Sequence, residues 1–163
     1  MNPNENDSHI IIRQVFSGAD IAEVRRLLAD YNAELGCDLS FQSFQSETEN
    51  LSAAYAPPAG RLFVAEYGDE IAGCAALRPF GNGKCEMKRM YIAPHLRGKG
   101  IGKLLAQEII SAAKEIGYKA ILLDTIPQLK AAVSMYKSMG FQEISPYREN
   151  PLTGARFFRL DLR

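Results

Sequence analysis

A short glycine-rich and basic segment has the clearest chemical character in the sequence. Residues 97–103, RGKGIGK, follow an apolar run directly and precede a stretch with helical spacing. Glycines let the backbone come close to a ligand, and the first turn of a helix presents unpaired N–H groups with a partial positive charge. Arg97, Lys99 and Lys103 add positive charge to the same segment. These features together predict a loop that binds phosphate or pyrophosphate.

The spacing of the glycines separates this loop from two common phosphate-binding patterns. The P-loop of NTPases needs G-x-x-x-x-G-K-[S/T], but here three residues separate Gly98 from Gly102, and Leu104 follows Lys103. The dinucleotide fingerprint G-x-G-x-x-G is one residue longer than the G-x-G-x-G found here. A third pattern, [R/Q]-x-x-G-x-[G/A], is matched in full by residues 97–102. This match resembles the coenzyme A loop of the GNAT family of N-acetyltransferases.

A second block extends the resemblance. Residues 131–141, AAVSMYKSMGF, are similar to the second block of that family through their A-x-x-x-Y and K-x-x-G-F features. The two blocks and the strands between them span residues 84–145. Many relatives carry an asparagine seven residues before the tyrosine, where this sequence has Leu129. Residues 17–55, where the family places much of its substrate specificity, contain no recognised motif.

The resemblance implies roles for particular residues. Tyr136 matches the general acid, which would protonate the leaving thiolate, and Glu86 lies where some relatives place the general base. Asp124 is a second candidate base. A backbone N–H group within residues 90–92 would stabilise the oxyanion. The implied cofactor-binding residues are Met90, Tyr91, Ile92, Arg97, Gly98, Lys99, Gly100, Ile101, Gly102 and Lys103.

Each catalytic candidate also has a structural interpretation. Tyr136 lies in line with the apolar residues of its helix and would serve as a core aromatic. Glu86 would be a carboxylate paired with Lys88 or Arg148. Asp124 would be a structural carboxylate at the end of its strand.

Strand alternation and loop position add two expectations about charged residues. Alternation places Glu86 on the same strand face as Lys88, Met90 and Ile92. Arg78 and Arg148 are expected as solvated charges or, alternatively, as residues that meet an acidic substrate.

The implied activity is that of an acetyl-CoA-dependent N-acetyltransferase. The acetyl group would pass directly to a primary amine of a small molecule or peptide in a ternary complex, without a covalent enzyme intermediate or a metal. The amine must first lose a proton, because an alkyl ammonium has a pKa of about 10.4. A non-catalytic acyl-CoA-binding sensor or interaction module on the same fold remains the alternative. The sequence leaves the acceptor amine and the acyl chain open.

Composition excludes several other classes. The chain has 163 residues with 19 basic and 19 acidic side chains, and this zero balance argues against a nucleic-acid binder. Cys37, Cys74 and Cys85 form no C-x-x-C pair, which excludes a disulfide framework and favours a reducing, cytoplasmic compartment. The apolar runs are too short to span a membrane, and the polar N-terminus is unlike a signal peptide. We expect no metal, nucleic-acid or membrane partner, and a homodimer stays open by analogy.

Hydrophobic periodicity predicts the elements that position these residues. The expected order is β-α-α-β-β-β-α-β-α-β-β, with a parallel, right-handed β-α-β unit inside an otherwise antiparallel sheet. The fold class is therefore mixed α/β, and the resemblance implies the acyl-CoA N-acyltransferase fold. We expect a disordered tail over residues 1–8 and one N-acetyltransferase domain over residues 9–163. The predicted strands are 10–15, 62–67, 71–77, 85–92, 120–123, 141–144 and 157–162, and the predicted helices are 17–35, 40–51, 101–116 and 129–139.

Overall fold

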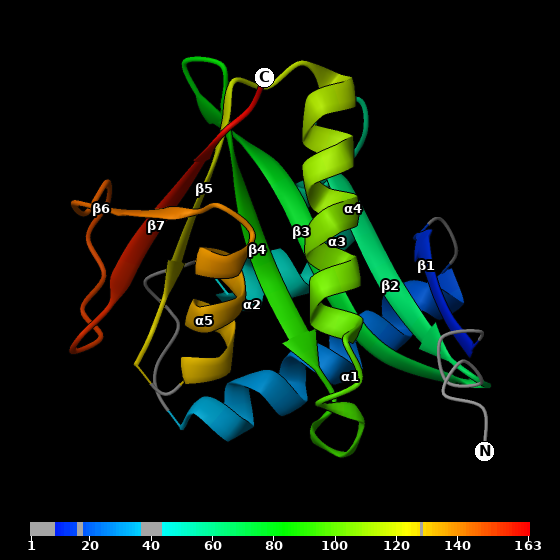
Figure 1. Cartoon of the computed structure of the whole chain (residues 1–163). Coiled ribbons are helices and arrows are strands. Elements are labelled where there is room, and N and C mark those ends of the chain that lie inside the picture. Colours follow the sequence, from blue (N-terminus) through cyan, green and yellow to red (C-terminus); the bar gives the residue numbers. More distant parts are fainter. Residues whose placement is uncertain (1–8, 16–17, 37–43, 128) are drawn as a thin grey trace, which may run out of the picture.

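The computed structural model describes residues 9–15, 18–36, 44–127 and 129–163 of the chain. The tail predicted over residues 1–8 and the predicted helix starts at Ser17 and Ser40 lie outside the described residues. The described residues form one seven-stranded sheet with helices on both faces (Figure 1). No helix among them is both long enough and apolar enough to cross a bilayer.

The sheet confirms the predicted fold class. Its strand order is β1-β2-β3-β4-β5-β7-β6, and every neighbouring pair is antiparallel except β4 and β5. The parallel pair is joined by a crossover helix, as a parallel connection requires. The strands are β1 (Ile10–Gln14), β2 (Arg61–Tyr67), β3 (Glu70–Gly81), β4 (Lys84–Ile92), β5 (Ala120–Thr125), β6 (Gln142–Ile144) and β7 (Arg156–Asp161).

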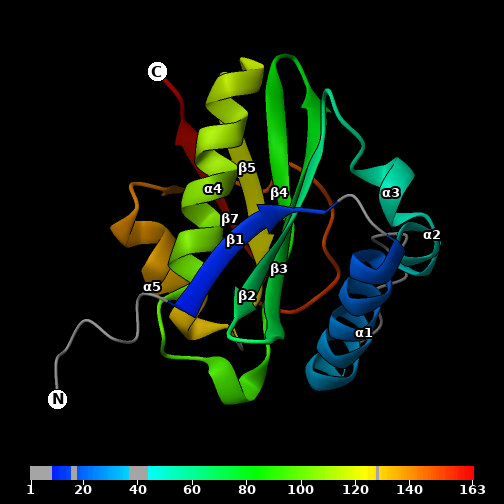
Figure 2. The same ribbon diagram turned by 90° about the vertical axis from the view of Figure 1, so that its right-hand side faces the viewer.

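The helices lie in two groups on opposite faces of the sheet (Figure 2). One group comprises α1 (Gly18–Leu35), α2 (Phe44–Glu49) and α3 (Leu51–Ala54). The other comprises α4 (Ile101–Ile116) and α5 (Lys130–Ser138), with the 3-10 turn η3 (Pro94–Leu96) before α4. Helix α1 packs against β3 and β4, and α4 packs against β2, β3 and β4. Strand β4 is therefore covered on both faces.

The crossover helix α4 shows how the sequence fixes an element. Its apolar residues recur every three or four positions, and Leu105, Ile109 and Ala113 are completely buried beneath it. Gly117 ends the helix with a φ of 103°, a left-handed conformation that residues with a Cβ rarely adopt. This ending directs the chain into β5.

The second predicted helix is divided in the structure. The spacing predicts one helix from Ser40 through Leu51, whereas the described residues form two short helices, α2 and α3, that meet at Asn50. The side-chain amide of Asn50 donates to the carbonyl of Ser46 at 2.9 Å, and its backbone N–H donates to Glu47 at 3.1 Å. Asparagine competes in this way with the regular helical hydrogen bonds and breaks the helix.

Strand β4 contains a bulge that overturns the expected face alternation. Lys88 pairs with Ala76 and Tyr91 with Cys74, so three steps along β4 oppose two along β3. Arg89 absorbs the extra residue with a φ of 58°. Glu86 and Lys88 therefore share a face with Tyr91, and the expectation that they share one with Met90 and Ile92 is wrong.

Strands β4 and β5 separate after a short parallel ladder. The ladder runs from Lys84 opposite Ala120 to Glu86 opposite Leu122. Beyond Glu86, the remaining residues of β4 pair with β3 but have no β5 partner among the described residues. The sheet thus opens at the carboxyl end of β4, where ligands bind in many open α/β sheets.

Candidate active site

A groove with a volume of about 440 Å³ lies between the carboxyl end of β4, the start of α4 and the face of α5. Every predicted cofactor residue lines this groove except Lys99, and Tyr136 lines it too. The ammonium of Lys99 lies instead 5.1 Å above the centre of the Tyr67 ring. The structure therefore brings the glycine-rich loop and the predicted acid to one site.

The glycine-rich loop has the backbone shape expected of an anion cradle. Gly98 and Gly100 have φ values of 81° and 82°, which favour glycine. Gly100 is the N-cap of α4, and no side chain within the described residues hydrogen-bonds to the cap. The first turn of a 16-residue helix therefore offers backbone N–H groups and a positive dipole end to the groove.

Arg97 connects this loop to helix α1. Its guanidinium donates to both carboxylate oxygens of Glu34, at 2.7 and 2.9 Å, and its Nε donates to the carbonyl of Ile92 at 3.0 Å. The hydroxyl of Tyr91 donates to the same carboxylate at 2.8 Å. The guanidinium of Arg97 lowers the pKa of Glu34, so that Glu34 is a carboxylate at neutral pH.

Tyr136 lies at the wall of the groove formed by α5. Only 5% of it is exposed, and its ring packs against Phe141 and Phe158, with centroids 5.5 and 6.5 Å away. Burial raises the pKa of Tyr136, so its phenol stays protonated across the neutral range. The side chain is therefore both a core aromatic and a hydroxyl donor at the groove.

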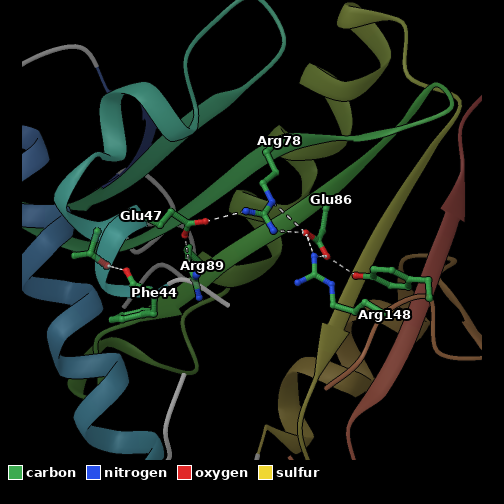
Figure 3. Close-up of polar contacts among 8 residues, drawn as sticks. Phe44, Glu47, Arg78, Glu86, Arg89 and Arg148 are labelled. Atoms are coloured by element: carbon green, nitrogen blue, oxygen red, sulfur yellow. Dashed lines mark hydrogen bonds and ion pairs between the residues drawn. The ribbon is translucent and has the colours of Figure 1, made fainter. Parts of the chain in front are cut away.

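Glu86 lies outside the groove. It is completely buried, and its carboxylate accepts hydrogen bonds from Arg78 at 3.1 Å, from Tyr147 at 2.6 Å and from Arg148 (Figure 3). The expected pairing of Glu86 with Arg148 is therefore present. Arg78 and Arg148 are ion-paired and are not solvated charges.

A second buried carboxylate, Glu47 of α2, joins the same set of charges. It accepts from Arg78 at 3.0 Å and from Arg89, whose guanidinium also lies 4.8 Å above the ring of Phe44 (Figure 3). We call Arg78, Lys88, Arg89 and Arg148, with Glu47 and Glu86, the basic cluster. Sequence reasoning missed Glu47 and Arg89. The available signal was two adjacent cations, residues 88 and 89, inside an otherwise apolar strand.

Asp124 occupies the carboxyl end of β5, across the opening from β4. Its carboxylate accepts a hydrogen bond from the side chain of Asn150 at 3.1 Å. It lines a small cavity together with Leu129, which also lines the large groove. Asp124 therefore lines a cavity that shares a wall residue with the groove, whereas Glu86 lines neither of the two.

Comparison with known proteins identifies the family. The model of the acetyltransferase (GNAT) family matches residues 22–141. The chain belongs to the GNAT family. An uncharacterized N-acetyltransferase of Schizosaccharomyces pombe is 40% identical over 158 residues, which cover 95% of this chain and 96% of the relative.

Solved structures agree with this assignment to the GNAT family. A GNAT acetyltransferase from Staphylococcus aureus has a TM-score of 0.79 and 25% identity, and the match covers 94% of this chain and 99% of that one. The structure of yncA from Salmonella typhimurium with its cofactor acetyl-CoA has a TM-score of 0.68 and 20% identity, covering 95% of each chain. This protein is thus an N-acetyltransferase by family and by fold.

Helix α5 gives this GNAT enzyme more of its groove than the sequence alone predicted. Leu129, Ala132 and Met135 line the groove beside Tyr136. Apolar spacing along this helix predicts a packing face, and the structure shows that part of that face also borders the groove. At Leu129, where many relatives have asparagine, the wall is apolar. The described residues contain no group of three or more His, Cys, Asp or Glu that could hold a metal.

Proposed function

We propose that the enzyme transfers an acetyl group from acetyl-CoA directly to a primary amine within a ternary complex. The observation that carries this proposal is the groove itself, which joins the N-terminus of α4 to Tyr136 along the end of β4 that has separated from β5. Acetyl-CoA bound there would supply the activated thioester. Residues 9–163 would act as one catalytic unit.

The shape and charge of the groove fit such a cofactor. Residues 98–103 would hold the pyrophosphate with backbone N–H groups, and Arg97 and Lys103 would add positive charge at the groove. Lys99, above the Tyr67 ring, would add positive charge beside it. A Cβ built on Gly98 or Gly100 meets nothing within 4 Å, so the space in front of the loop is open. Residues 90–92 would hold the pantetheine arm and donate a backbone N–H to the thioester oxygen.

Tyr136 would act as the general acid. A leaving thiolate with a pKa of about 8.5 needs a proton donor, and a buried phenol whose pKa is raised remains protonated for this task. The position of Tyr136 on the groove wall supports this role.

The base is a carboxylate or a water molecule, and the geometry favours Asp124 over Glu86. Both oxygens of Glu86 are engaged by arginines, and Tyr147 donates to one of them. Glu86 also lines neither the groove nor the small cavity beside Asp124. We therefore give Glu86 a positioning role, in which it holds Arg78 and Arg148, and Asp124 the role of base.

The remaining expectations stay part of this proposal. The zero net charge and the free, buried thiols of Cys74 and Cys85 favour a cytoplasmic enzyme without a nucleic-acid or membrane partner. A homodimer is consistent with the family and is tested by light scattering.

Calorimetric titration with acetyl-CoA, with NAD and ATP as controls, tests the cofactor assignment. We expect micromolar binding of acetyl-CoA and none of comparable strength for the controls. A thiol-release screen with a panel of amines then tests transfer. Binding without release from any amine would support the sensor alternative, and equal binding of NAD or ATP would overturn the assignment of the loop.

A further inference from the structure

The basic cluster lies on the face of the sheet that carries α1 and α2, opposite the helices that form the groove (Figures 2 and 3). Strand β4 contributes to both places, because Lys88 belongs to the cluster and Met90 lines the groove. Lys88 and Met90 flank the bulge at Arg89, so one strand carries both a member of the cluster and part of the groove lining.

The cluster holds more positive than negative charge. Among the described residues, it combines four cations with two carboxylates, Glu47 and Glu86. Asp124 approaches its edge beside Tyr147, and even with Asp124 included the cations remain in excess. Buried charge of one sign is costly unless a counter-charge completes it.

Lys88 is the cation of the cluster without a direct ion pair among the described residues, although the charges of Glu86 and Glu47 act on it from further away. It is 5% exposed, and its ammonium is buried without a hydrogen-bond partner among the described residues. Burial, reinforced by the charges of Arg89, Arg78 and Arg148, lowers the pKa of Lys88 to about 8. The Nε of Arg148 is also buried without a partner there. The ammonium of Lys88 and the Nε of Arg148 are therefore two donors of the cluster that a bound acceptor could satisfy.

The cluster is open on one side. Arg78 and Arg148 approach the carboxylate of Glu86 from β3 and from the loop between β6 and β7, and their side chains are 29% and 20% exposed (Figure 3). The rings of Phe80 and Tyr147 pack edge to face beside them, with centroids 5.0 Å apart. Solvent therefore reaches the two arginines, and an anion that approached the cluster from this side would meet them before Lys88.

We propose that the acceptor of this enzyme is an amine that carries a carboxylate, and that Lys88, Arg78 and Arg148 bind this carboxylate. This inference rests on the proposed function. The carboxylate would supply the missing counter-charge and orient the amine toward the groove. It would also account for a buried lysine, whose burial lowers stability, just beyond the point where β4 and β5 separate.

Substrate selectivity of the wild-type enzyme tests the inference without any mutation. The thiol-release assay compares glycine, β-alanine, 4-aminobutyrate, aspartate and glutamate with their carboxamides, in which the charge is removed and the amine is kept. Each rate is corrected for the fraction of unprotonated amine. We expect at least one acid to exceed its amide at least tenfold in kcat/KM. Equal or better use of every amide would overturn the inference and leave the proposed function intact.

Variants connect the selectivity to the cluster. Lys88→Met and, separately, Arg148→Gln should each reduce the acid-to-amide ratio at least tenfold, mainly through the KM for the acid. Arg148 lies in a loop, so its variant serves if Lys88→Met fails to fold by circular dichroism. Arg26→Gln, in an exposed ion pair of α1, is the matched control and should preserve the ratio. A ratio unchanged in both cluster variants would overturn the assignment.

A binding measurement separates this inference from the transfer reaction. The melting temperature of the CoA-saturated protein is measured with millimolar acid or amide. A rise that is specific for the acids and lost in Lys88→Met supports the anion site even if no amine is acetylated, an outcome that would go against the proposed function alone. Equal shifts for acids and amides, or none, would overturn the anion site.

Discussion

The guanidinium of Arg97 and the carboxylate of Glu34 form a two-point ion pair, with N–O distances of 2.7 and 2.9 Å. This pair joins the first residue of the glycine-rich loop to the end of α1. The same guanidinium is the one expected to meet the pyrophosphate, so Glu34 competes with the cofactor for Arg97. Both side chains are more than one third exposed, which limits the strength of the pair.

Removal of this competitor should strengthen cofactor binding. Glu34→Gln keeps the shape of the side chain but removes the negative charge near the loop, and we expect acetyl-CoA to bind about twofold to fivefold more tightly. Calorimetry at low and high salt measures the effect, which salt should diminish. Glu23→Gln, on the same helix and paired with Arg26, is the control. Weaker binding in Glu34→Gln would show that Glu34 positions Arg97 and does not compete for it.

Negative charge at the N-cap of α4 should abolish cofactor binding. Gly100→Asp and Gly100→Asn share the same strain at a φ of 82°, so a comparison of the two isolates charge from conformation. We expect the aspartate variant to bind acetyl-CoA at least tenfold more weakly than the asparagine variant, because a carboxylate would occupy the anion site. Similar affinities in these two variants would contradict the role of the loop.

Loss of the Tyr136 hydroxyl should slow turnover and spare binding. Tyr136→Phe retains the packing against Phe141 and Phe158 but removes the proton donor. We expect kcat to fall at least about tenfold, with an unchanged dissociation constant for acetyl-CoA. Tyr118→Phe removes a hydroxyl that donates to the carbonyl of Ala59, and it controls for general effects. Equal kcat in wild type and Tyr136→Phe would leave Tyr136 as a core aromatic only.

The two candidate bases should respond differently to neutralisation. Asp124→Asn should remove the acidic limb of the pH profile of kcat/KM, because that limb reports the deprotonation of the base. Glu86→Gln should keep the limb but lower the free energy of unfolding by about 3 kcal/mol, since it removes a fully buried carboxylate that two partly buried arginines share. Urea denaturation measures this loss. If the acidic limb were lost in Glu86→Gln and kept in Asp124→Asn, Glu86 would be the base.

The buried ammonium of Lys88 should lower the free energy of unfolding near neutral pH. Its pKa is about 8 in the native protein and about 10.4 in an unfolded chain, so between these pH values the unfolded chain binds more protons. The free energy of unfolding should therefore rise with pH from 8 to 10.4 in wild type. Lys88→Met should remove this rise and stabilise the protein at pH 7 by on the order of 3 kcal/mol.

Denaturation at several pH values tests this stability prediction. Lys114→Met, an exposed lysine of α4, is the control and should leave the pH dependence unchanged. A Lys88→Met variant that is less stable than wild type at pH 7 would show that the ammonium is better compensated than the described contacts indicate.

Local patterns were sufficient to predict most of the fold. The periodicity of α4 and its terminal glycine identify that helix, and the spacing of residues 97–102 identifies the loop before it. These features are local, because a turn or a helix face is specified by residues close in sequence. The division between α2 and α3 was missed because it depends on a side-chain hydrogen bond of Asn50.

The charged part of the site needed tertiary contacts. Arg89 pairs with Glu47, which lies 42 positions earlier, and no local pattern predicts such a pair. The bulge at Arg89 also changes which residues share a face, because one inserted residue reverses the alternation beyond it. From the sequence alone, Lys88 is therefore expected beside Met90 and Ile92. The pairing of Glu86 with Arg148 is among the sequence-based expectations, whereas the pairing of Arg78 with Glu47 and Glu86 is not.

The short ladder between β4 and β5 has a mechanical consequence. Among the residues that the structure describes, the β1–β4 and β5–β7 parts of the sheet pair only from Lys84 opposite Ala120 to Glu86 opposite Leu122. The cofactor groove has one wall on β4 and another on α5, which follows β5. A ligand in the groove therefore contacts both parts of the sheet and bridges the gap between β4 and β5. The free energy needed to separate the two parts of the sheet then increases with the concentration of the ligand.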